Sequence, residues 1–209
     1  IGRVKIAGNE RWVGFIGGGD YTRSSCTGSS SPPTGDFGRG FFVVDLSNGS
    51  LIWRYTRATN SAMARVPAPP AIIDTDNDGF IDAAYVGDTD GNMWRFKFCK
   101  GTDTSSCGTG NWTGSKLFDA SGHIRPIYSG AAIAKDTSGN MWVYWGSGDK
   151  QCPSSANQER FFAIKDDGDS YSASNLDNIT SGTYSDAANK HGWYIQFGGQ
   201  EAVLSEPTI

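Results

Sequence analysis

A nine-residue pattern that occurs twice restricts the fold of this chain more than any other feature of its sequence. Residues 88–96 read DTDGNMWRF and residues 136–144 read DTSGNMWVY, so both copies share Asp, Thr, Gly, Asn, Met and Trp in one order. A Gly-Asn or Asn-Gly pair favours the tight turn of a β-hairpin. A looser copy, VVDLSNGSLIWRY, runs from Val43 to Tyr55. One hairpin unit used several times, with each Trp packed between neighbouring sheets, indicates a β-propeller.

The rest of the chain has the composition of a β protein. It contains 28 Gly, and aromatic residues make up 12% of it. Short runs rich in aromatic and branched residues, bounded by Gly, Asp, Asn or Ser, predict strands at 12–19, 39–46, 51–55, 80–88, 92–98, 140–148, 160–166 and 192–197. Helical periodicity is nearly absent; residues 171–190 hold either a short helix or a polar excursion. We therefore predict an all-β fold, a β-propeller of quinoprotein-like type, with a β-sandwich as the alternative.

Chain length sets the expected number of blades. A blade takes roughly 40 to 50 residues in repeat propellers, so 209 residues supply about four or five. That number is too small for most closed rings. We expect residues 1–209 to form a single β-propeller domain or part of one, with an incomplete or irregular ring. The first residue is not Met and the last residues, Glu206 to Ile209, read like the middle of a strand, so we expect a piece of a longer protein.

Charge and motif content argue against several classes of function. The net charge is −4 and there is no Lys/Arg run, so we expect no nucleic-acid partner. The apolar runs are far shorter than the roughly 20 residues of a membrane span. No Gly-x-Ser-x-Gly, phosphate-binding or dinucleotide-binding motif occurs. The only histidines, His123 and His191, fit structural or exposed positions better than catalytic ones. The sequence predicts no enzyme.

Four cysteines indicate disulfides. Cys99 and Cys107 bracket the polar stretch CKGTDTSSC, which favours a bridge that closes this small loop. Cys26 and Cys152 each follow a Gly-x-Gly-Asp turn, so they occupy comparable places and are expected to pair. Bridges imply an oxidising compartment. The alternative is four unpaired cysteines in a cytosolic domain.

The stretch DTDNDGFID, residues 74–82, is the strongest candidate site. Asp74, Asp76 and Asp78 take positions 1, 3 and 5 of a calcium loop of EF-hand type, Phe80 supplies a backbone carbonyl at position 7, and Asp82 takes position 9. Gly at position 6 allows the sharp turn. Tyr85 stands at position 12 in place of the usual Glu, so Asp82 has to bind directly. An all-oxygen donor set favours Ca2+ over zinc, copper or magnesium.

The alternative for this stretch is a solvated acidic turn whose Asp side chains cap backbone amides. Two observations count against it. The sister hairpin AIAKDTSGNMW keeps one acidic residue, Asp136, so a hairpin of this kind does not need four carboxylates. Nothing basic lies nearby in sequence to offset them. The other acidic turn, residues 166–169, lacks the ligand spacing and is expected to be only a turn.

Residues 67–98, PAPPAIIDTDNDGFIDAAYVGDTDGNMWRFKF, resemble the C-terminal propeller of the PilY/PilC family of type IV pilus tip-associated adhesins. That family has an Asp-rich calcium loop followed by Gly-Asp-x-Asp-Gly-Asn-x-Trp-Arg-Phe, which stands here at 87–96. GRGFFVVDL from Gly38 and HGWYIQFGGQEAVLSEPTI from His191 are also similar to family segments. The resemblance covers most of the chain and is strongest over residues 38–98.

The resemblance implies a protein of the cell surface or pilus tip, in the outer membrane, the periplasm or outside the cell. It implies support of pilus biogenesis, twitching motility and surface adhesion, with minor pilins and a surface or host ligand as partners. Calcium held by Asp74, Asp76, Asp78, the Phe80 carbonyl and Asp82 is thought, in the family, to oppose pilus retraction. The family's variable N-terminal region is missing here, and no Arg-Gly-Asp tripeptide occurs.

Two other functions remain open on the sequence alone. Trp53 after DLSNGSLIW is similar to the Trp repeat of quinoprotein dehydrogenases, which often carry an adjacent Cys-Cys pair and gather calcium ligands from several blades. Here no cysteines are adjacent, and the candidate ligands come from one loop. A passive envelope scaffold with a structural calcium is the third possibility.

Overall fold

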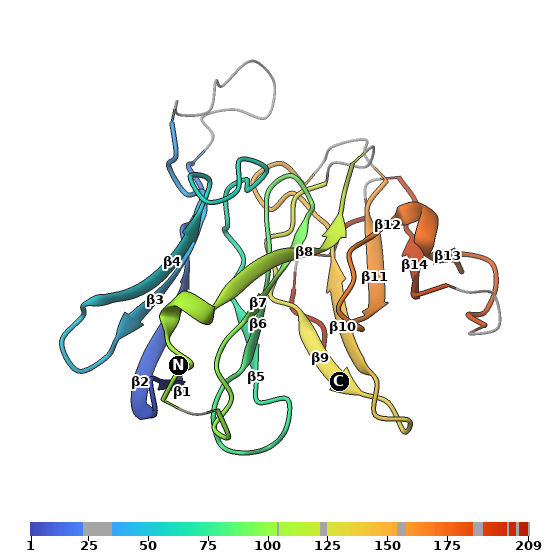
Figure 1. Cartoon of the computed structure of the whole chain (residues 1–209). Coiled ribbons are helices and arrows are strands. Elements are labelled where there is room, and N and C mark those ends of the chain that lie inside the picture. Colours follow the sequence, from blue (N-terminus) through green and yellow to red (C-terminus); the bar gives the residue numbers. More distant parts are fainter. Residues whose placement is uncertain are drawn as a thin grey trace.

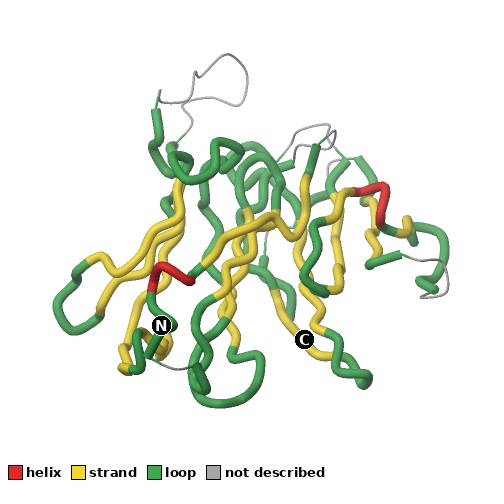
Figure 2. Tube along the Cα trace, in the orientation of Figure 1, coloured by secondary structure: helices red, strands yellow, loops and turns green. Residues whose placement is uncertain are grey.

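The computed structural model describes residues 1–22, 35–103, 105–121, 125–153, 158–185, 190–199, 201–203 and 205–208. Three β-sheets stand side by side in this part of the chain, and each is twisted (Figure 1). The two helices in the described ranges are single 3-10 turns, η1 (Thr109–Asn111) and η2 (Ala173–Asn175), as Figure 2 shows. No helix in these ranges has the length and apolar character of a membrane span. The all-β prediction is confirmed.

The three sheets follow one another along the chain. The first is an antiparallel sheet of β1 (Gly2–Ile6), β2 (Asn9–Gly17), β3 (Gly40–Asp45) and β4 (Leu51–Thr56). The second contains β5 (Ala71–Ile73), β6 (Ala83–Gly87), β7 (Met93–Lys97) and β8 (Thr113–Asp119), with β12 (Tyr171–Ser172) parallel to β8. The third contains β9 (Ala132–Lys135), β10 (Met141–Gly146), β11 (Arg160–Lys165) and β14 (Gly192–Gln196), with β13 (Asp177–Asn178) parallel to β14.

All eight predicted runs contain strands, namely β2, β3, β4, β6, β7, β10, β11 and β14. The strands that the sequence did not single out are short or polar: β5 has three residues, and β8 reads TGSKLFD. The described residues form three sheets, fewer than the four or five blades that the chain length predicts. Long connections and the short added strands β12 and β13 take up the difference. The described part of the 171–190 stretch holds β12, η2 and β13, so its helix is a single turn.

The repeated Asp-Thr-x-Gly-Asn-Met-Trp pattern builds the same turn twice. Asp88 follows β6 and accepts hydrogen bonds from the Asn92 backbone N–H (2.9 Å) and from the Trp94 indole N–H (2.7 Å). In the β9–β10 turn, Asp136 accepts the corresponding bonds from Asn140 (2.9 Å) and the Trp142 indole (3.0 Å). Gly91 and Gly139 both adopt φ near +90°, at 88° and 85°, where a side chain is strained. One carboxylate therefore fixes both the turn and the tryptophan that follows it.

Aromatic side chains fill the space between neighbouring sheets. Phe41 of β3 stacks on Phe96 of β7 with ring centroids 4.2 Å apart and planes 5° from parallel. Between the second and third sheets, Phe118 of β8 contacts Trp145 (5.6 Å) and Phe162 (4.9 Å). Burying such rings contributes about 2–3 kcal/mol each. The predicted role of the repeat as an inter-sheet packing unit is confirmed at Trp94, which is fully buried and contacts Tyr55 of the first sheet with ring centroids 5.8 Å apart.

A buried polar contact also joins the second sheet to the third. Arg95 of β7 forms an ion pair with Asp166, which follows β11, and its guanidinium donates to the Gly168 carbonyl (2.7 Å). The Tyr85 hydroxyl donates to the second oxygen of Asp166 (2.6 Å). The prediction that residues 166–169 are only a turn is therefore incomplete, because Asp166 also links two sheets.

Within the described ranges, the three sheets form an open arrangement and not a closed ring. The first sheet packs one face on the second sheet and exposes apolar side chains on the other. These are Trp12, Ile16, Leu46 and Leu51, with Trp12 56% exposed. Gly14 lies in the same face, since a side chain there meets Val44 and Leu46. An incomplete ring, as predicted from the sequence, leaves such a face without a neighbouring sheet.

We expect Asp88→Ala to lower the free energy of unfolding by about 3 kcal/mol or more. The substitution leaves the buried N–H groups of Trp94 and Asn92 without an acceptor. Asp136→Ala removes the same contacts from a turn at the surface, where water replaces them, so its loss is smaller. Urea unfolding followed by circular dichroism measures both. Equal losses contradict this account of the repeat.

The hydrogen bonds of Asp136 should also make the free energy of unfolding depend on pH. Hydrogen bonds from Asn140 and Trp142 hold the pKa of Asp136 well below its ordinary value. A depressed folded-state pKa contributes stability above the unfolded-state pKa of about 4, and this contribution is lost as the pH falls through the folded value. The stability difference between the wild type and Asp136→Asn should therefore shrink from about pH 4 to pH 2. A constant difference in thermal unfolding over this range refutes the assignment.

Candidate metal centre

The aspartate loop, residues 74–82, connects β5 to β6 at the lower end of the second sheet in Figure 1. Strands on either side fix its ends, because Ile73 pairs with Ala83. Asp74, Asp76 and Asp78 each offer one carboxylate oxygen, and these oxygens all lie within 4.8 Å of one another. Three of the five predicted ligands are thus brought together at the tip of one loop.

Two residues with positive φ bend the loop back on itself. Asn77 has φ 61° and Gly79 has φ 91°, a region where Gly and Asn are tolerated best. The curl points backbone N–H groups at the first aspartate: Asp74 accepts from the Gly79 N–H (2.7 Å) and the Asp78 N–H (3.1 Å). Burial acts to raise the pKa of Asp74, but these donors outweigh it and keep that pKa below its ordinary value. Asp74 is therefore a carboxylate at neutral pH.

Asp82 lies apart from this cluster of three. Its side chain is 4% exposed and accepts hydrogen bonds from the Thr75 backbone N–H (3.0 Å) and the Thr75 hydroxyl (2.5 Å). Burial raises the pKa of Asp82, with the Thr75 hydrogen bonds opposing the shift. Through these two hydrogen bonds, Asp82 at the end of the loop is linked to Thr75 at its start.

Phe80, the remaining predicted ligand, contacts the cluster through its backbone N–H, which donates to Asp78 (2.9 Å). Its ring lies under two cations, since the Arg3 guanidinium and the Lys5 ammonium are each 5.0 Å from the ring centroid. Arg3 also donates to the Gly79 carbonyl from Nη2 (3.0 Å). The N-terminal strand β1 thereby supports the loop from one side.

A second loop supports the aspartates from the other side. Lys100 donates from Nζ to Asp76 (3.2 Å), and the Gly101 N–H donates to Asp78 (2.6 Å). The hydrogen bond to Asp76 raises the pKa of Lys100. A basic residue distant in sequence therefore does reach the acidic cluster. One ammonium group against three carboxylates still leaves the cluster negative.

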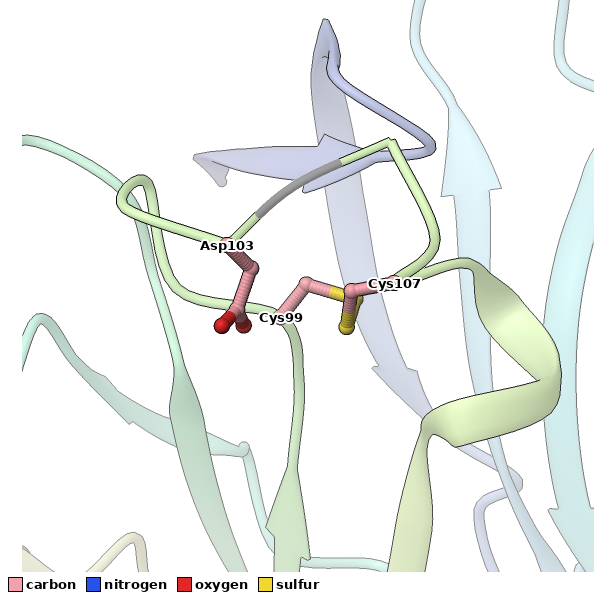
Figure 3. A group of neighbouring side chains, drawn as sticks. All are labelled: Cys99, Asp103 and Cys107. Atoms are coloured by element: carbon pink, nitrogen blue, oxygen red, sulfur yellow. A yellow bond between two sulfur atoms is a disulfide. The ribbon is translucent and has the colours of Figure 1, made fainter.

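A disulfide holds this second loop. Cys99 and Cys107 are bonded, with Cα atoms 5.9 Å apart, which confirms the predicted bridge. Figure 3 shows Asp103 in the loop between the two cysteines, and its carboxylate accepts from the Lys100 N–H (2.7 Å). Oxidised sulfurs are not thiolate ligands, so Cys99, Asp103 and Cys107 form a structural group and not a metal site. The other predicted pairing involves Cys26, which lies outside the described residues, and stays a prediction.

Sequence reasoning missed Lys100 and Gly101, although the hairpin contained the signal. In the antiparallel pairing of β6 with β7, Ala83 faces Lys97, and the Phe98 N–H bonds the Asp82 carbonyl beyond the strand ends. Continued by two more residues, this register brings Lys100 to the level of Phe80. The prediction that no basic residue compensates the loop is wrong, because Lys100 is distant from Asp76 in sequence but close to it in the fold.

Of the two histidines, His191 lies in the described part of the chain, where its contacts are with Asp167 and Tyr171. His191 bonds Asp167 through Nδ1 (3.1 Å) and stacks on Tyr171 with ring centroids 4.2 Å apart. His123 lies outside the described residues.

The repeated hairpin sheets, their aromatic interfaces and the aspartate loop together define a β-propeller with an acidic loop between two strands of one blade. A family model described as the PilY1 beta-propeller domain matches residues 7–135. This match spans more than half of the chain, so the chain belongs to the PilY1 β-propeller domain family.

Individual relatives agree with the family. The chain is 30% identical over 142 residues to a type IV pilus biogenesis factor PilY1 homolog of Xylella fastidiosa, which covers 60% of this chain and 9% of the relative. It is 37% identical over 54 residues to the type IV pilus biogenesis factor PilY1 of Pseudomonas aeruginosa strain UCBPP-PA14, 26% of this chain and 5% of the relative. The chain thus spans under a tenth of these curated relatives.

A solved structure supports the fold. The crystal structure of the Pseudomonas aeruginosa PilY1 C-terminal domain superposes with a TM-score of 0.64 at 16% identity, over 96% of this chain and 50% of that chain. The propeller fold is confirmed, and this chain corresponds to half of that domain. Three sheets that do not close a ring are consistent with a chain that covers half of that domain.

We expect Gly101→Ala to disturb the aspartate loop. A Cβ at this position meets an Asp78 carboxylate oxygen and the Phe80 ring at 2.5 Å each, so Asp78 has to move. Amide chemical shifts of residues 74–80 should change, and the unfolding free energy should fall by about 1 kcal/mol. Gly110→Ala is the matched control, because nothing lies within 4 Å of its Cβ. Unchanged shifts in Gly101→Ala show that the two loops are not in contact.

Proposed function

We propose that this chain is the calcium-binding propeller part of a type IV pilus-associated protein at the cell surface or pilus tip. In this role it supports pilus biogenesis, twitching motility and surface adhesion, with minor pilins and a surface or host ligand as partners. Membership in the PilY1 family and the similarity to type IV pilus biogenesis factors support the pilus role. The gathered carboxylates of Asp74, Asp76 and Asp78 support calcium, and they are the single observation that carries the site.

The donor chemistry fits calcium. Calcium takes six to eight oxygen ligands in a flexible arrangement, and the loop offers carboxylates together with backbone carbonyls. Asp74, Asp76, Asp78, the Phe80 carbonyl and Asp82 would hold the ion. Bound calcium would neutralise the cluster and tie the β5–β6 connection together. For Asp82 to bind directly, its carboxylate has to give up a hydrogen bond from Thr75.

The solvated acidic turn is the competing account, and Lys100 is its best support. If Lys100 alone compensates the negative charge of the loop, no metal ion is needed. Its side chain is 49% exposed and that of Asp76 is 32% exposed, and an ion pair at such a surface is worth about 1 kcal/mol or less. This is too little to offset three clustered carboxylates, so we favour the metal.

We expect no catalysis, because the candidate site in the described residues consists of carboxylates held by backbone N–H groups and Lys100. A quinoprotein role would place calcium between several blades, whereas every candidate ligand here lies in one connection. Added quinone with a quinoprotein substrate should therefore give no redox turnover.

Calorimetry with calcium tests the site directly. We expect Asp76→Asn combined with Asp78→Asn to weaken calcium binding roughly a hundredfold or more, since both changes keep side-chain size but remove ligand charge. Asp90→Asn, an exposed acidic change in the neighbouring hairpin, is the matched control and should bind as the wild type does. Lys100→Gln should bind calcium at least as tightly as the wild type, because it removes a competing cation. Equal affinity in the double variant overturns the ligand assignment.

The pilus role is tested separately in the source bacterium. Deletion of the gene should reduce surface pili and twitching, and the intact gene should restore both. A gene with Asp76→Asn and Asp78→Asn separates the calcium site from the scaffold, since it should restore a folded protein but not normal twitching. Unchanged piliation and twitching after deletion contradict the pilus role without bearing on calcium.

A further inference from the structure

The outer face of the first sheet, which is turned away from the second sheet, carries a contiguous group of apolar side chains. In β3, Phe41 points at the second sheet, where it stacks on Phe96. Side chains alternate along a strand, so Phe42 and Val44 point the other way, and both are half-buried. The same face holds four of the six large apolar side chains that are exposed in the described residues, namely Trp12, Ile16, Leu46 and Leu51. A patch of this kind marks an interaction surface, and Figure 1 shows the sheet at one end of the row of three.

Comparable cross-strand pairs in the other two sheets pack against the preceding sheet. The second strand of each sheet, β2, β6 or β10, ends in Gly, and the residue before this Gly pairs with a residue of the third strand. The three pairs are Ile16–Phe42, Val86–Trp94 and Trp145–Phe162. Trp94 contacts Tyr55 of the first sheet, and Trp145 contacts Phe118 of the second sheet. The four residues of the second and third pairs are at most 2% exposed, whereas Ile16 is 47% exposed. The same position therefore forms an inter-sheet contact in two sheets and is open in the first.

The geometry points to the outer face of the first sheet as an interface for a further β-sheet of the same polypeptide, formed by residues outside 1–209. This chain covers 50% of the solved PilY1 C-terminal domain, while that domain covers 96% of this chain. The other half of such a domain has room for further sheets, and each sheet of a closed ring has a neighbour on both faces. A sheet on the same polypeptide also has a high effective concentration at this face, which favours it over a second copy of the chain.

The outer face also indicates the chemistry of the sheet that covers it. The apolar patch requires apolar side chains opposite it. Arg54 lies on this face, opposite Phe42 in the β3–β4 pairing. It is exposed, and its guanidinium forms no ion pair or hydrogen bond within the described ranges. Covering an unpaired guanidinium is costly, so the covering sheet should place a carboxylate near Arg54, as Asp166 of the third sheet pairs with Arg95 of the second.

Photo-crosslinking in the complete gene product tests the interface. Benzoylphenylalanine that replaces Trp12 or Leu51 should cross-link to residues outside 1–209 of the same polypeptide. Peptide mass spectrometry locates the link, and a denaturing gel shows whether the product has the mass of one chain. Thr102, an exposed residue of the disulfide-closed loop, is the control position and should not link to the same residues. A link between two chains, a link to residues within 1–209, or no link at either position overturns the proposal.

A second experiment tests the expected carboxylate. Arg54→Lys in the complete gene product supplies an amine that a water-soluble carbodiimide joins to a neighbouring carboxylate as an amide. We expect this amide to form with an Asp or Glu outside 1–209. Lys100 with Asp76, whose charged atoms are 3.2 Å apart, is the internal positive control. If the control pair forms its amide and the introduced amine forms none, the acidic partner of Arg54 is wrong.

Discussion

Repulsion between three carboxylates is the constraint on which the lower end of this molecule depends. Asp74, Asp76 and Asp78 are held within 4.8 Å of one another, and like charges at such distances cost stability unless positive charge compensates them. The backbone N–H groups that bond Asp74 and Asp78 supply part of the compensation, and Lys100 supplies another part. Because the Lys100 ammonium offsets one of three carboxylate charges, we propose that a divalent cation supplies the remaining compensation.

The three sheets provide the rigid frame that such a cluster requires. Phe41 stacks on Phe96, and Phe118 contacts Trp145 and Phe162, so each sheet is fixed against the next by buried rings. The Arg95–Asp166 pair adds a polar connection at the edge of the same interface. Through these contacts the second sheet is fixed against its neighbours, and with it the strands β5 and β6 that hold the two ends of the aspartate loop.

The strands and repeated turns could be predicted from sequence because their signals are local. A single Asp-to-Trp pattern encodes the turn and the buried ring, and both copies at Asp88 and Asp136 form it. The spacing of Asp74, Asp76 and Asp78 likewise predicted which carboxylates meet. Non-local facts were missed. Lys100 reaches Asp76 only through hairpin register, Asp82 turns inward to Thr75, and the number of sheets depends on how much chain the connections use.

A crystal structure of this chain, grown with millimolar calcium and measured for anomalous scattering, tests the central claim most directly. The account predicts an anomalous peak inside the aspartate loop, with carboxylate oxygens of Asp74, Asp76 and Asp78 at about 2.3–2.6 Å from it. An ordered loop whose carboxylates bond only Lys100, water and backbone N–H groups, with no peak among them, would contradict it.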